Sequence, residues 1–229
     1  MKAVILAGGL GTRLRPLTDI LPKPLLPVGE RSVLEIMIAK LKEFGFNELY
    51  IATGYKSHLF ENYFGDGSRL KVKIKFSKER KPLGTAGPLK LLQNELKEPF
   101  PVMYGDIITS LNFHNLKKFH LSNKSDFTLV TKKIFLPISY GLIKSKGNLI
   151  QSIEEKPLVK SEINTGIYYV NPEVIKYIPD GFFHMTDLAK LLIKKNKKVM
   201  RYRLQEYWID IGEKENYEKA QKNYEDGEI

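Results

Sequence analysis

The sequence predicts an α/β fold, in which a doubly wound and mostly parallel mixed sheet carries helices on both faces and a small β-rich lobe follows. Two observations predict it. Short apolar runs alternate with segments of helical periodicity through the first half of the chain. The first run, residues 2–7, is nearly all apolar and ends in glycines, which is typical of a strand buried on both faces of a parallel sheet. The 229 residues, 42% of them hydrophobic and 28% charged, suffice for a buried core.

The first half of the chain alternates predicted strands and helices. After the strand at 2–7 and a long loop, Ser32-Val33-Leu34-Glu35 forms a capping box, and apolar residues follow at helical spacing until Gly45 ends the helix. This order predicts a Rossmann-like sheet. The further elements expected here are a strand at 48–53, a helix at 57–64, a strand at 72–77, a helix at 85–96 and a strand ending at 104.

The second half of the chain is richer in consecutive strands. No linker rich in Gly, Pro or Ser separates the halves, and there is no internal repeat or low-complexity tract. We therefore expect one domain over residues 1–229 with two lobes, about 1–110 and about 111–229. The elements expected in the second lobe are strands at 127–131, 141–144, 149–153 and 163–170 and helices at 185–195 and 213–224.

The composition argues against several classes of function. Cysteine is absent and the four histidines lack metal-ligand spacing, so disulfides, thiolate nucleophiles and zinc sites are not expected. The formal charge of +11, from 37 basic and 26 acidic residues, favours polyanionic partners or reflects a lysine-rich composition. Only 7 of the basic residues are arginine, which argues against sequence-specific nucleic-acid binding. No apolar run is long enough to span a membrane, so we expect a cytoplasmic protein without a membrane partner.

A glycine-rich loop directly follows the first predicted strand. Residues 8–13 read Gly-Gly-Leu-Gly-Thr-Arg, and the carboxyl ends of parallel strands are where ligands bind in such sheets. Glycines let backbone N–H groups approach phosphate oxygens, although a plain tight turn uses the same residues. The dinucleotide fingerprint is absent because Leu14 occupies the third glycine position, and no Gly-Lys-Ser/Thr ends the loop as in a P-loop.

A lysine between two prolines follows this loop. Residues 22–24 read Pro-Lys-Pro, and the prolines fix the backbone direction around Lys23. Lys23 alone reads as a solvated loop lysine. Together with Arg13 in the same segment, it predicts two cations that bracket one phosphate pocket.

The loop and the lysine together resemble the sugar-phosphate nucleotidylyltransferases, or NDP-sugar pyrophosphorylases, whose mark is Gly-x-Gly-Thr-Arg followed by Pro-Lys-Pro. The sequence looks closest to catalytic domains of the mannose-1-phosphate guanylyltransferase type. The resemblance implies that the first lobe binds the nucleotide and that the second binds the sugar phosphate. It continues at residues 82–87 (Pro-Leu-Gly-Thr-Ala-Gly), 105–106 (Gly-Asp), 154–157 (Glu-Glu-Lys-Pro), 164–166 (Asn-Thr-Gly) and 208–212 (Trp-Ile-Asp-Ile-Gly).

The resemblance implies a nucleotide site. Small residues at 83–87, at a predicted helix start, let a flat base lie close to backbone N–H groups, although they also fit a purely structural helix start. Thymidylyltransferases more often carry another triplet after the Leu-Gly of this segment, so it favours GTP. Arg13 and Lys23 are the implied catalytic residues. The implied nucleotide-binding residues are Leu6, Ala7, Gly8, Gly9, Gly11, Thr12, Arg13, Lys23, Gly84, Thr85 and Ala86.

A metal site and a sugar-phosphate site are implied in the same way. The resemblance pairs Asp106 and Asp210 as ligands of Mg²⁺, which proteins hold by one or two carboxylates plus substrate phosphates. Either aspartate alone also fits a cap or a turn. Lys156 is implied to hold the phosphate of the sugar, although it also fits a surface turn. The implied sugar-phosphate-binding residues are Tyr140, Gly141, Glu154, Lys156, Asn164 and Thr165.

The implied reaction joins an NTP, with GTP favoured, to a sugar 1-phosphate of mannose, manno-heptose or glucosamine type and releases pyrophosphate. A phosphomonoester with a second pKa near ~6 is largely a dianion at neutral pH, so the nucleophile needs little help from a base. A glucose-1-phosphate thymidylyl- or uridylyltransferase and a non-catalytic nucleotide-sugar sensor stay open as alternatives. The resemblance also suggests a homodimer. No hexapeptide repeat is present, so we expect no β-helix domain.

Overall fold

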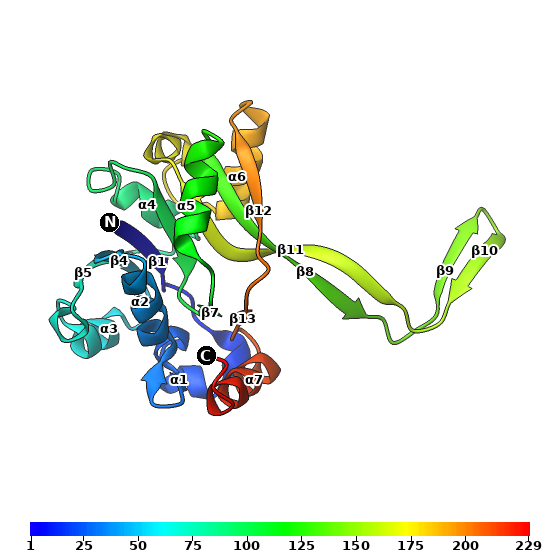
Figure 1. The fold of residues 1–229 in the computed structure, drawn as a ribbon, viewed down its shortest axis with the longest axis horizontal. Coiled ribbons are helices and arrows are strands. Elements are labelled where there is room, and N and C mark those ends of the chain that lie inside the picture. Colours follow the sequence, from blue (N-terminus) through cyan, green and yellow to red (C-terminus); the bar gives the residue numbers. More distant parts are fainter.

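The computed structural model describes residues 1–229 and confirms the predicted α/β class (Figure 1). A seven-stranded mixed sheet, in the order β12-β8-β11-β6-β1-β4-β5, forms its centre. Strands from both halves of the chain build it. The strands that run parallel on one side are β1 (Lys2–Leu6), β4 (Glu48–Thr53), β5 (Lys73–Lys78) and β6 (Phe100–Tyr104).

The other side of the sheet is mixed. β11 (Leu158–Val170) runs antiparallel to both β6 and β8 (Phe127–Pro137), whereas β12 (Val199–Arg203) runs parallel to β8. The predicted strands at 127–131 and 163–170 are therefore the inner parts of two longer strands. β12 was not predicted, because its sequence, Val-Met-Arg-Tyr-Arg, has neither a continuous apolar run nor a clean alternation.

Helices cover both faces of the sheet, as predicted. Alternate residues of β1 point to opposite faces, so Ala3 and Ile5 belong to one core cluster and Val4 and Leu6 to the other. None of the helices combines the length and the apolar character that crossing a bilayer requires. The helices on the first face are α2 (Val33–Glu43), α3 (Ser57–Phe64) and α5 (Phe113–Ser122), and those on the second are α4 (Gly87–Leu91) and α6 (Met185–Lys194).

Helix α2 begins with the predicted capping box. The Ser32 side chain accepts a hydrogen bond from the Glu35 N–H at 3.2 Å, and the Glu35 carboxylate accepts one from the Ser32 N–H at 3.1 Å. Two N–H groups that a helix start leaves free are thereby satisfied. The first α-helix, the single turn α1 (Leu17–Ile20), lies in the long loop before it.

The helix predicted at 85–96 is wrong in extent, because α4 covers only Gly87–Leu91. The residues before it form a turn tied to another segment: the Ala86 N–H donates to the Phe183 carbonyl at 2.8 Å. After Leu91 the chain makes separate turns, such as Leu92 N–H to Leu89 O at 3.0 Å and Leu96 N–H to Leu92 O at 3.1 Å, and no regular helix. A contact with a segment almost a hundred residues away thus overrides the local helical pattern.

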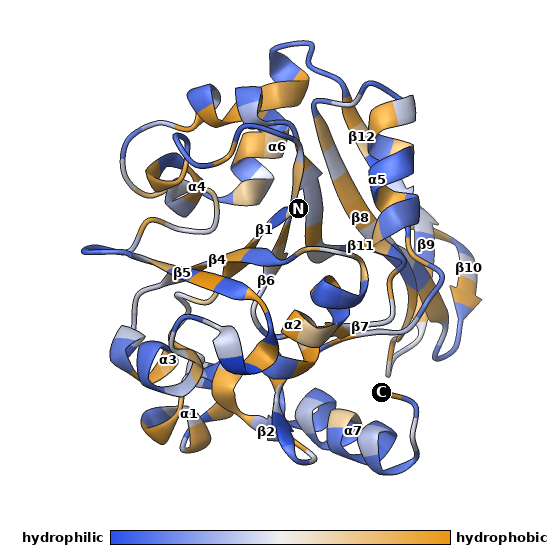
Figure 2. Ribbon diagram, turned by 60° about the vertical axis from the view of Figure 1, so that its left-hand side comes forward, coloured by the Kyte–Doolittle hydropathy of each residue, from blue (hydrophilic) through white to orange (hydrophobic).

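The C-terminal segment returns to the start of the chain. A third apolar cluster joins Val28 and Ile36 from the beginning of the chain to Ile209 and Ala220 near its end. Figure 2 shows that α7 is largely hydrophilic, in keeping with its position on the surface. The elements that meet here are β2 (Pro27–Val28), β3 (Arg31–Ser32), β7 (Ile107–Thr109), β13 (Trp208–Asp210) and α7 (Lys214–Glu225).

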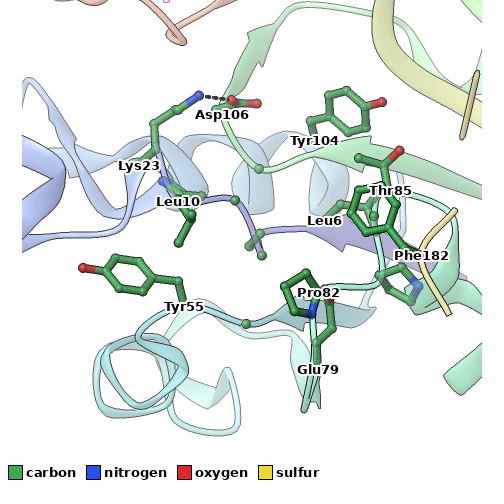
Figure 3. A pocket seen from close by; sticks show the side chains of 18 of the residues that line it. Leu6, Leu10, Lys23, Tyr55, Glu79, Pro82, Thr85, Tyr104, Asp106 and Phe182 are labelled. Atoms are coloured by element: carbon green, nitrogen blue, oxygen red, sulfur yellow. Dashed lines mark hydrogen bonds and ion pairs between the residues drawn. The ribbon is translucent and has the colours of Figure 1, made fainter. Parts of the chain in front are cut away.

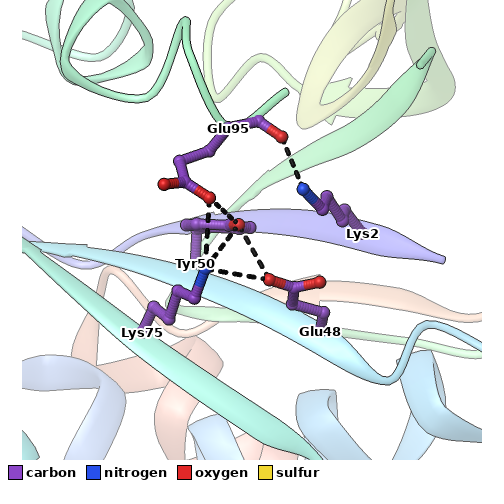
Figure 4. Close-up of polar contacts among 5 residues, drawn as sticks. All are labelled: Lys2, Glu48, Tyr50, Lys75 and Glu95. Carbon is purple, nitrogen blue, oxygen red and sulfur yellow. Dashed lines mark hydrogen bonds and ion pairs between the residues drawn. The ribbon is translucent and has the colours of Figure 1, made fainter. Parts of the chain in front are cut away.

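A polar cluster lies on the amino-terminal half of the parallel strands (Figure 4). The Tyr50 hydroxyl lies 2.9 Å from a Glu48 carboxylate oxygen and 2.8 Å from one of Glu95, and the Lys75 ammonium bridges both carboxylates. Burial and these two carboxylates raise the pKa of Tyr50 to about 12, so its hydroxyl stays protonated. The cluster links β4 and β5 to the segment before β6.

A two-stranded arm extends away from the rest of the molecule (Figure 1). We define the arm as residues 132–163, the outer parts of β8 and β11 and the hairpin between them. That hairpin consists of β9 (Leu142–Lys146) and β10 (Leu149–Glu154), which pair with each other and with no other strand. The predicted strands at 141–144 and 149–153 are thereby confirmed.

Candidate active site

A large cavity opens where four parallel strands end, as the glycine loop predicted. It has a volume of about 610 Å³ and is lined by the residues that directly follow β1, β4, β5 and β6. Figure 3 shows Lys23 and Asp106 on one side of this cavity and Glu79 and Pro82 on the opposite side. The predicted nucleotide-binding residues that line it are Leu6, Ala7, Gly8, Gly9, Lys23, Gly84 and Thr85, and the predicted metal ligand Asp106 lines it too.

The glycine loop keeps its shape through Gly11. Gly11 has a φ of +66°, a conformation that costs other residues energy, and a Cβ there would lie 2.9 Å from the Thr18 side chain. The Thr18 hydroxyl donates to the Gly11 carbonyl at 2.8 Å. This contact turns the chain so that Thr12 and Arg13 form a short 3-10 helix beyond the cavity lining.

Lys23 and Asp106 meet at one end of the cavity. The Lys23 ammonium lies 2.7 Å from an Asp106 carboxylate oxygen, and the two side chains are only 13% and 19% exposed. Gly105 permits this approach, since a Cβ at that position would lie 3.0 Å from Pro24. The Pro-Lys-Pro segment and the end of β6 therefore form a half-buried ion pair.

Asp210 reaches the same place from the far end of the sequence. β13 pairs antiparallel with β7, which places Asp210 opposite Ile107, and the Ile211 N–H donates to the Asp106 carbonyl at 3.0 Å. Burial and the neighbouring negative charge of Asp106 raise the pKa of Asp210, although Lys23 and the Gly212 N–H at 2.6 Å oppose the shift. The structure thus brings the two predicted metal ligands together.

The raised pKa of Asp210 predicts a stability cost. At a pH well below 3.8, the ordinary pKa of an aspartate, Asp210 is neutral in both the folded and the unfolded chain. At higher pH the folded chain must bury the negative charge of Asp210. We expect Asp210→Asn to raise the free energy of unfolding at pH 7 by about 0.5–2 kcal/mol. The gain should shrink as the pH falls through the raised pKa. Urea unfolding at several pH values in EDTA measures it, and a less stable variant at pH 7 would contradict the prediction.

Arg13 lies beside the aspartate pair but outside the cavity lining. Its guanidinium forms an ion pair with Glu213 at 2.7 Å, and both side chains are largely exposed. Because exposed ion pairs contribute only about 0–1 kcal/mol, an arriving phosphate can release Arg13 at little cost. Arg13 also lowers the pKa of Asp210 slightly, which places its charge near the carboxylates.

The segment at 83–87 forms one wall of the cavity. Gly84 has a φ of +73°, and a Cβ there would lie 2.5 Å from the Phe183 carbonyl oxygen, so only glycine fits. Gly84 and Thr85 line the cavity, and the Thr85 hydroxyl accepts from the Met185 N–H at 2.8 Å. Ala86 is fully buried beneath the wall. Its N–H is bonded to Phe183, which leaves it no free donor for a base.

Among the lining residues that were not predicted, four carry side chains that could bind a nucleotide. Glu79 and Tyr55 come shortly after β5 and β4, and Tyr104 ends β6. All three lie at or just after strand ends that the sequence predicted, and this position could have identified them as candidates. Phe182 had no such signal, because its loop reaches the cavity from the other end of the chain.

Glu79 is the one carboxylate on the wall opposite Lys23. One oxygen accepts the Leu83 N–H at 2.9 Å, and no protein donor bonds to the other, which lies against Gly8. Burial raises the pKa of Glu79, although the Leu83 N–H opposes the shift. A carboxylate in this situation gains most from a ligand that offers further hydrogen-bond donors.

Of the predicted sugar-phosphate residues, two lie near the cavity. The Asn164 amide donates to the Tyr168 hydroxyl at 2.7 Å, and that hydroxyl lies 3.1 Å from the hydroxyl of Tyr104, which lines the cavity. Thr165 is buried, and its hydroxyl donates to the Val130 carbonyl at 2.8 Å. The Thr165 carbonyl accepts the Trp208 indole N–H at 3.0 Å, which ties β11 to β13.

The other four predicted sugar-phosphate residues lie on the arm and not at the cavity. Tyr140, Gly141, Glu154 and Lys156 are exposed, and none of them lines it. Lys156 has a φ of +46° and no ion-pair partner. Within one chain, therefore, the structure brings most of the predicted nucleotide and metal residues together but leaves these four sugar-phosphate residues apart from them.

Comparison with known proteins agrees with this geometry. Curated relatives include a mannose-1-phosphate guanyltransferase of Pichia angusta, 37% identical over 95% of this chain, and a UTP--glucose-1-phosphate uridylyltransferase of Synechocystis, 35% identical over 96%. The chain spans 62% of the length of each.

Solved structures of similar fold point the same way. A putative glucose-1-phosphate thymidylyltransferase of Bacillus anthracis superposes with a TM-score of 0.80 at 26% identity, covering 97% of this chain and 94% of that one. HddC of Yersinia pseudotuberculosis, complexed with GMP-PN, has a TM-score of 0.78 at 26% identity, covering 97% and 99%. The family model described as nucleotidyl transferase matches residues 2–227. The chain therefore belongs to the nucleotidyl transferase family.

Proposed function

We propose that the protein is a guanylyltransferase that joins GTP to a sugar 1-phosphate of mannose, manno-heptose or glucosamine type. The observation that carries the choice of base is the half-buried Glu79 carboxylate, which has one oxygen free on the cavity wall opposite Lys23 and Asp106. The guanyltransferase relatives and the HddC complex with GMP-PN support the same base.

Guanine fits a carboxylate better than the other bases do. Its N1–H and N2–H₂ are adjacent donors on one edge, and a carboxylate is an acceptor with two oxygens. Uracil and thymine present a single N3–H between two carbonyl oxygens, which a carboxylate would repel. Glu79 is therefore suited to select guanine, and Tyr55 and Phe182 supply flat apolar surface in the same cavity.

The charged end of the cavity is suited to the triphosphate. A sugar phosphate oxygen attacks the α-phosphorus, forming a new P–O bond while the bond from the α-phosphorus to the β-phosphate oxygen breaks and pyrophosphate leaves. Lys23 is placed to offset the negative charge of the triphosphate, and Arg13 joins it when its exposed pair with Glu213 opens. No base is needed for the dianionic nucleophile, so binding and orientation are the main demands.

The residues present fit a magnesium ion. The negative charge of Asp106 helps to raise the pKa of the neighbouring Asp210, and a divalent cation would relieve that repulsion. No group of three or more Asp, Glu, His or Cys side chains is placed to hold a metal. Two carboxylates completed by substrate phosphates are the pattern of Mg²⁺. When bound, the ion would neutralise phosphate charge.

The test is pyrophosphate release across GTP, ITP, UTP and dTTP with each candidate sugar phosphate. We expect GTP to exceed ITP, which lacks the N2 amino group, by about 10- to 100-fold in kcat/KM, since a hydrogen bond to a charged group contributes about 1.5–3 kcal/mol. Glu79→Gln should lower kcat/KM for GTP and narrow the gap to ITP. The matched control, Glu98→Gln, changes an exposed carboxylate far from the cavity lining.

Other results would point to other functions. Faster turnover of UTP or dTTP than of GTP would contradict the guanylyl proposal and favour the alternative that the uridylyltransferase relative suggests. Nucleotide binding without turnover of any sugar phosphate would favour the sensor.

A further inference from the structure

The arm exposes an unusually large apolar surface. Nine of its large apolar side chains are 39–78% exposed. No helix or third strand covers β9 or β10 (Figure 1). These side chains are Phe135, Leu136, Tyr140, Leu142, Ile143, Leu149, Ile150, Ile153 and Leu158.

Such an arm is not a stable unit by itself. An isolated two-stranded hairpin is marginally stable in water. Neighbouring residues of a strand point to opposite faces, so these nine exposed side chains cover both faces of the arm. Apolar patches larger than roughly 300–600 Å² are rare on a monomer, whereas a partner in a stable interface buries roughly 800 Å². The exposed area therefore suits a macromolecular occupant of fixed shape.

The arm is held away from the cavity of its own chain. Its outer ladder runs without interruption from the pair Leu158–Pro137 to the pair Asn164–Thr131. At about 3.3 Å per residue, Leu158 lies on the order of 20 Å from Asn164 along the strand. Folding Lys156 back onto the cavity of the same chain would break this ladder.

The cations at the cavity are either paired with carboxylates or belong to the wall opposite Lys23. Lys23 is paired with Asp106 and Arg13 with Glu213. Arg80 and Lys81 also line the cavity and directly follow Glu79, which Figure 3 shows on the side opposite Lys23. The proposed reaction brings a second phosphate to the Lys23 end, and Lys156, which the resemblance implies holds that phosphate, stands on the arm without an ion-pair partner.

We propose that two copies of this chain exchange arms, so that the arm of each copy packs on the other and the partner's Lys156 completes the sugar-phosphate site. This inference rests on the proposed function. A second copy is the occupant because it supplies both the apolar surface and the missing cation, and a two-fold axis makes the exchange mutual. The exchange therefore needs an intact β8–β11 ladder in each chain and not a flexible hinge.

Complementation between two inactive variants tests the exchange. Lys23→Ala disables the body of one chain and Lys156→Ala disables its arm, so each variant alone should be nearly inactive. In an equal mixture unfolded and refolded together, or coexpressed, half of the dimers pair unlike chains, and one of their two sites is intact. We expect about a quarter of the wild-type rate from this arithmetic. A mixture of Lys23→Ala with Asp106→Asn, both in the body, should give no more activity than the average of the two variants measured alone.

The outcomes separate the exchange from the proposed function. Active wild-type enzyme whose mixed variants stay inactive would overturn the exchange and leave the guanylyltransferase proposal intact. Light scattering gives a readout without activity: the wild-type mass should be twice 26.3 kDa, and a monomer would overturn the inference.

A second variant tests the arm surface directly. We expect Leu149→Asp with Ile153→Asp to give a folded monomer by circular dichroism that still binds GTP but loses turnover of sugar phosphate. A dimer, or a monomer with the wild-type rate, would overturn the exchange. The control is Ile193→Asp, which places one such charge on an exposed apolar residue of α6 and should alter neither mass nor rate.

Discussion

Replacing Lys23 by alanine is expected to lower kcat by about 10²–10³-fold, the usual effect of removing one group that stabilises developing charge in a protected site. Lys23 is only 13% exposed and 2.7 Å from Asp106, so no other side chain can take its place. KM for GTP should change less than kcat if the ammonium acts mainly in the transition state. Steady-state kinetics of pyrophosphate release measures both.

The control for Lys23→Ala is Lys118→Ala. Lys118 lies on the exposed side of α5 and forms no ion pair, so its removal subtracts the same charge without touching the cavity. If the two variants have equal rates, Lys23 has no catalytic role. Circular dichroism of Lys23→Ala should match the wild type, since Pro22 and Pro24 hold the loop without the lysine side chain.

Asp106→Asn is expected to raise the Mg²⁺ concentration for half-maximal rate by about 10–100-fold, because a neutral amide replaces one of the two carboxylates. The Lys23 ammonium then loses its ion-pair partner, so GTP should bind as well as before, or better, in the absence of metal. This opposite movement of metal and nucleotide affinity distinguishes a ligand from a merely structural residue. Magnesium titrations of the rate and GTP titrations in EDTA measure the two.

Asp226→Asn is the matched control for this variant. Asp226 is exposed at the end of α7 and should leave the magnesium curve unchanged. A normal magnesium curve for Asp106→Asn would remove the proposed metal role of the pair.

Local chemistry explains what the sequence predicted correctly. The first strand follows from its apolar run, and helix α2 from its capping box, because both depend on residues that are neighbours in the chain. The glycine loop and the Lys23 segment were located for the same reason. Asp106 was singled out by a strand end, whereas its pairing with Asp210 came from resemblance and is realised by the β7–β13 ladder.

Long-range contacts explain what the sequence did not predict. The turn at 83–87 and the shortness of α4 depend on a hydrogen bond to Phe183, and Phe182 enters the cavity with the same loop. Glu79 follows a strand end but was passed over because it stands within a run of charged residues. Its role emerges only when the ends of β1 and β5 place it against Gly8.

The sequence by itself determined the α/β class, the order of most elements and the position of the phosphate and metal residues, because periodicity, caps and glycine patterns act over a few residues. The tertiary structure alone decided which side chains share a site. It placed Asp210 beside Asp106, over a hundred residues away, and it held Lys156 outside the cavity of its own chain. The physical reason is that strand pairing fixes distance and direction between distant segments, and no local pattern encodes which strands will pair.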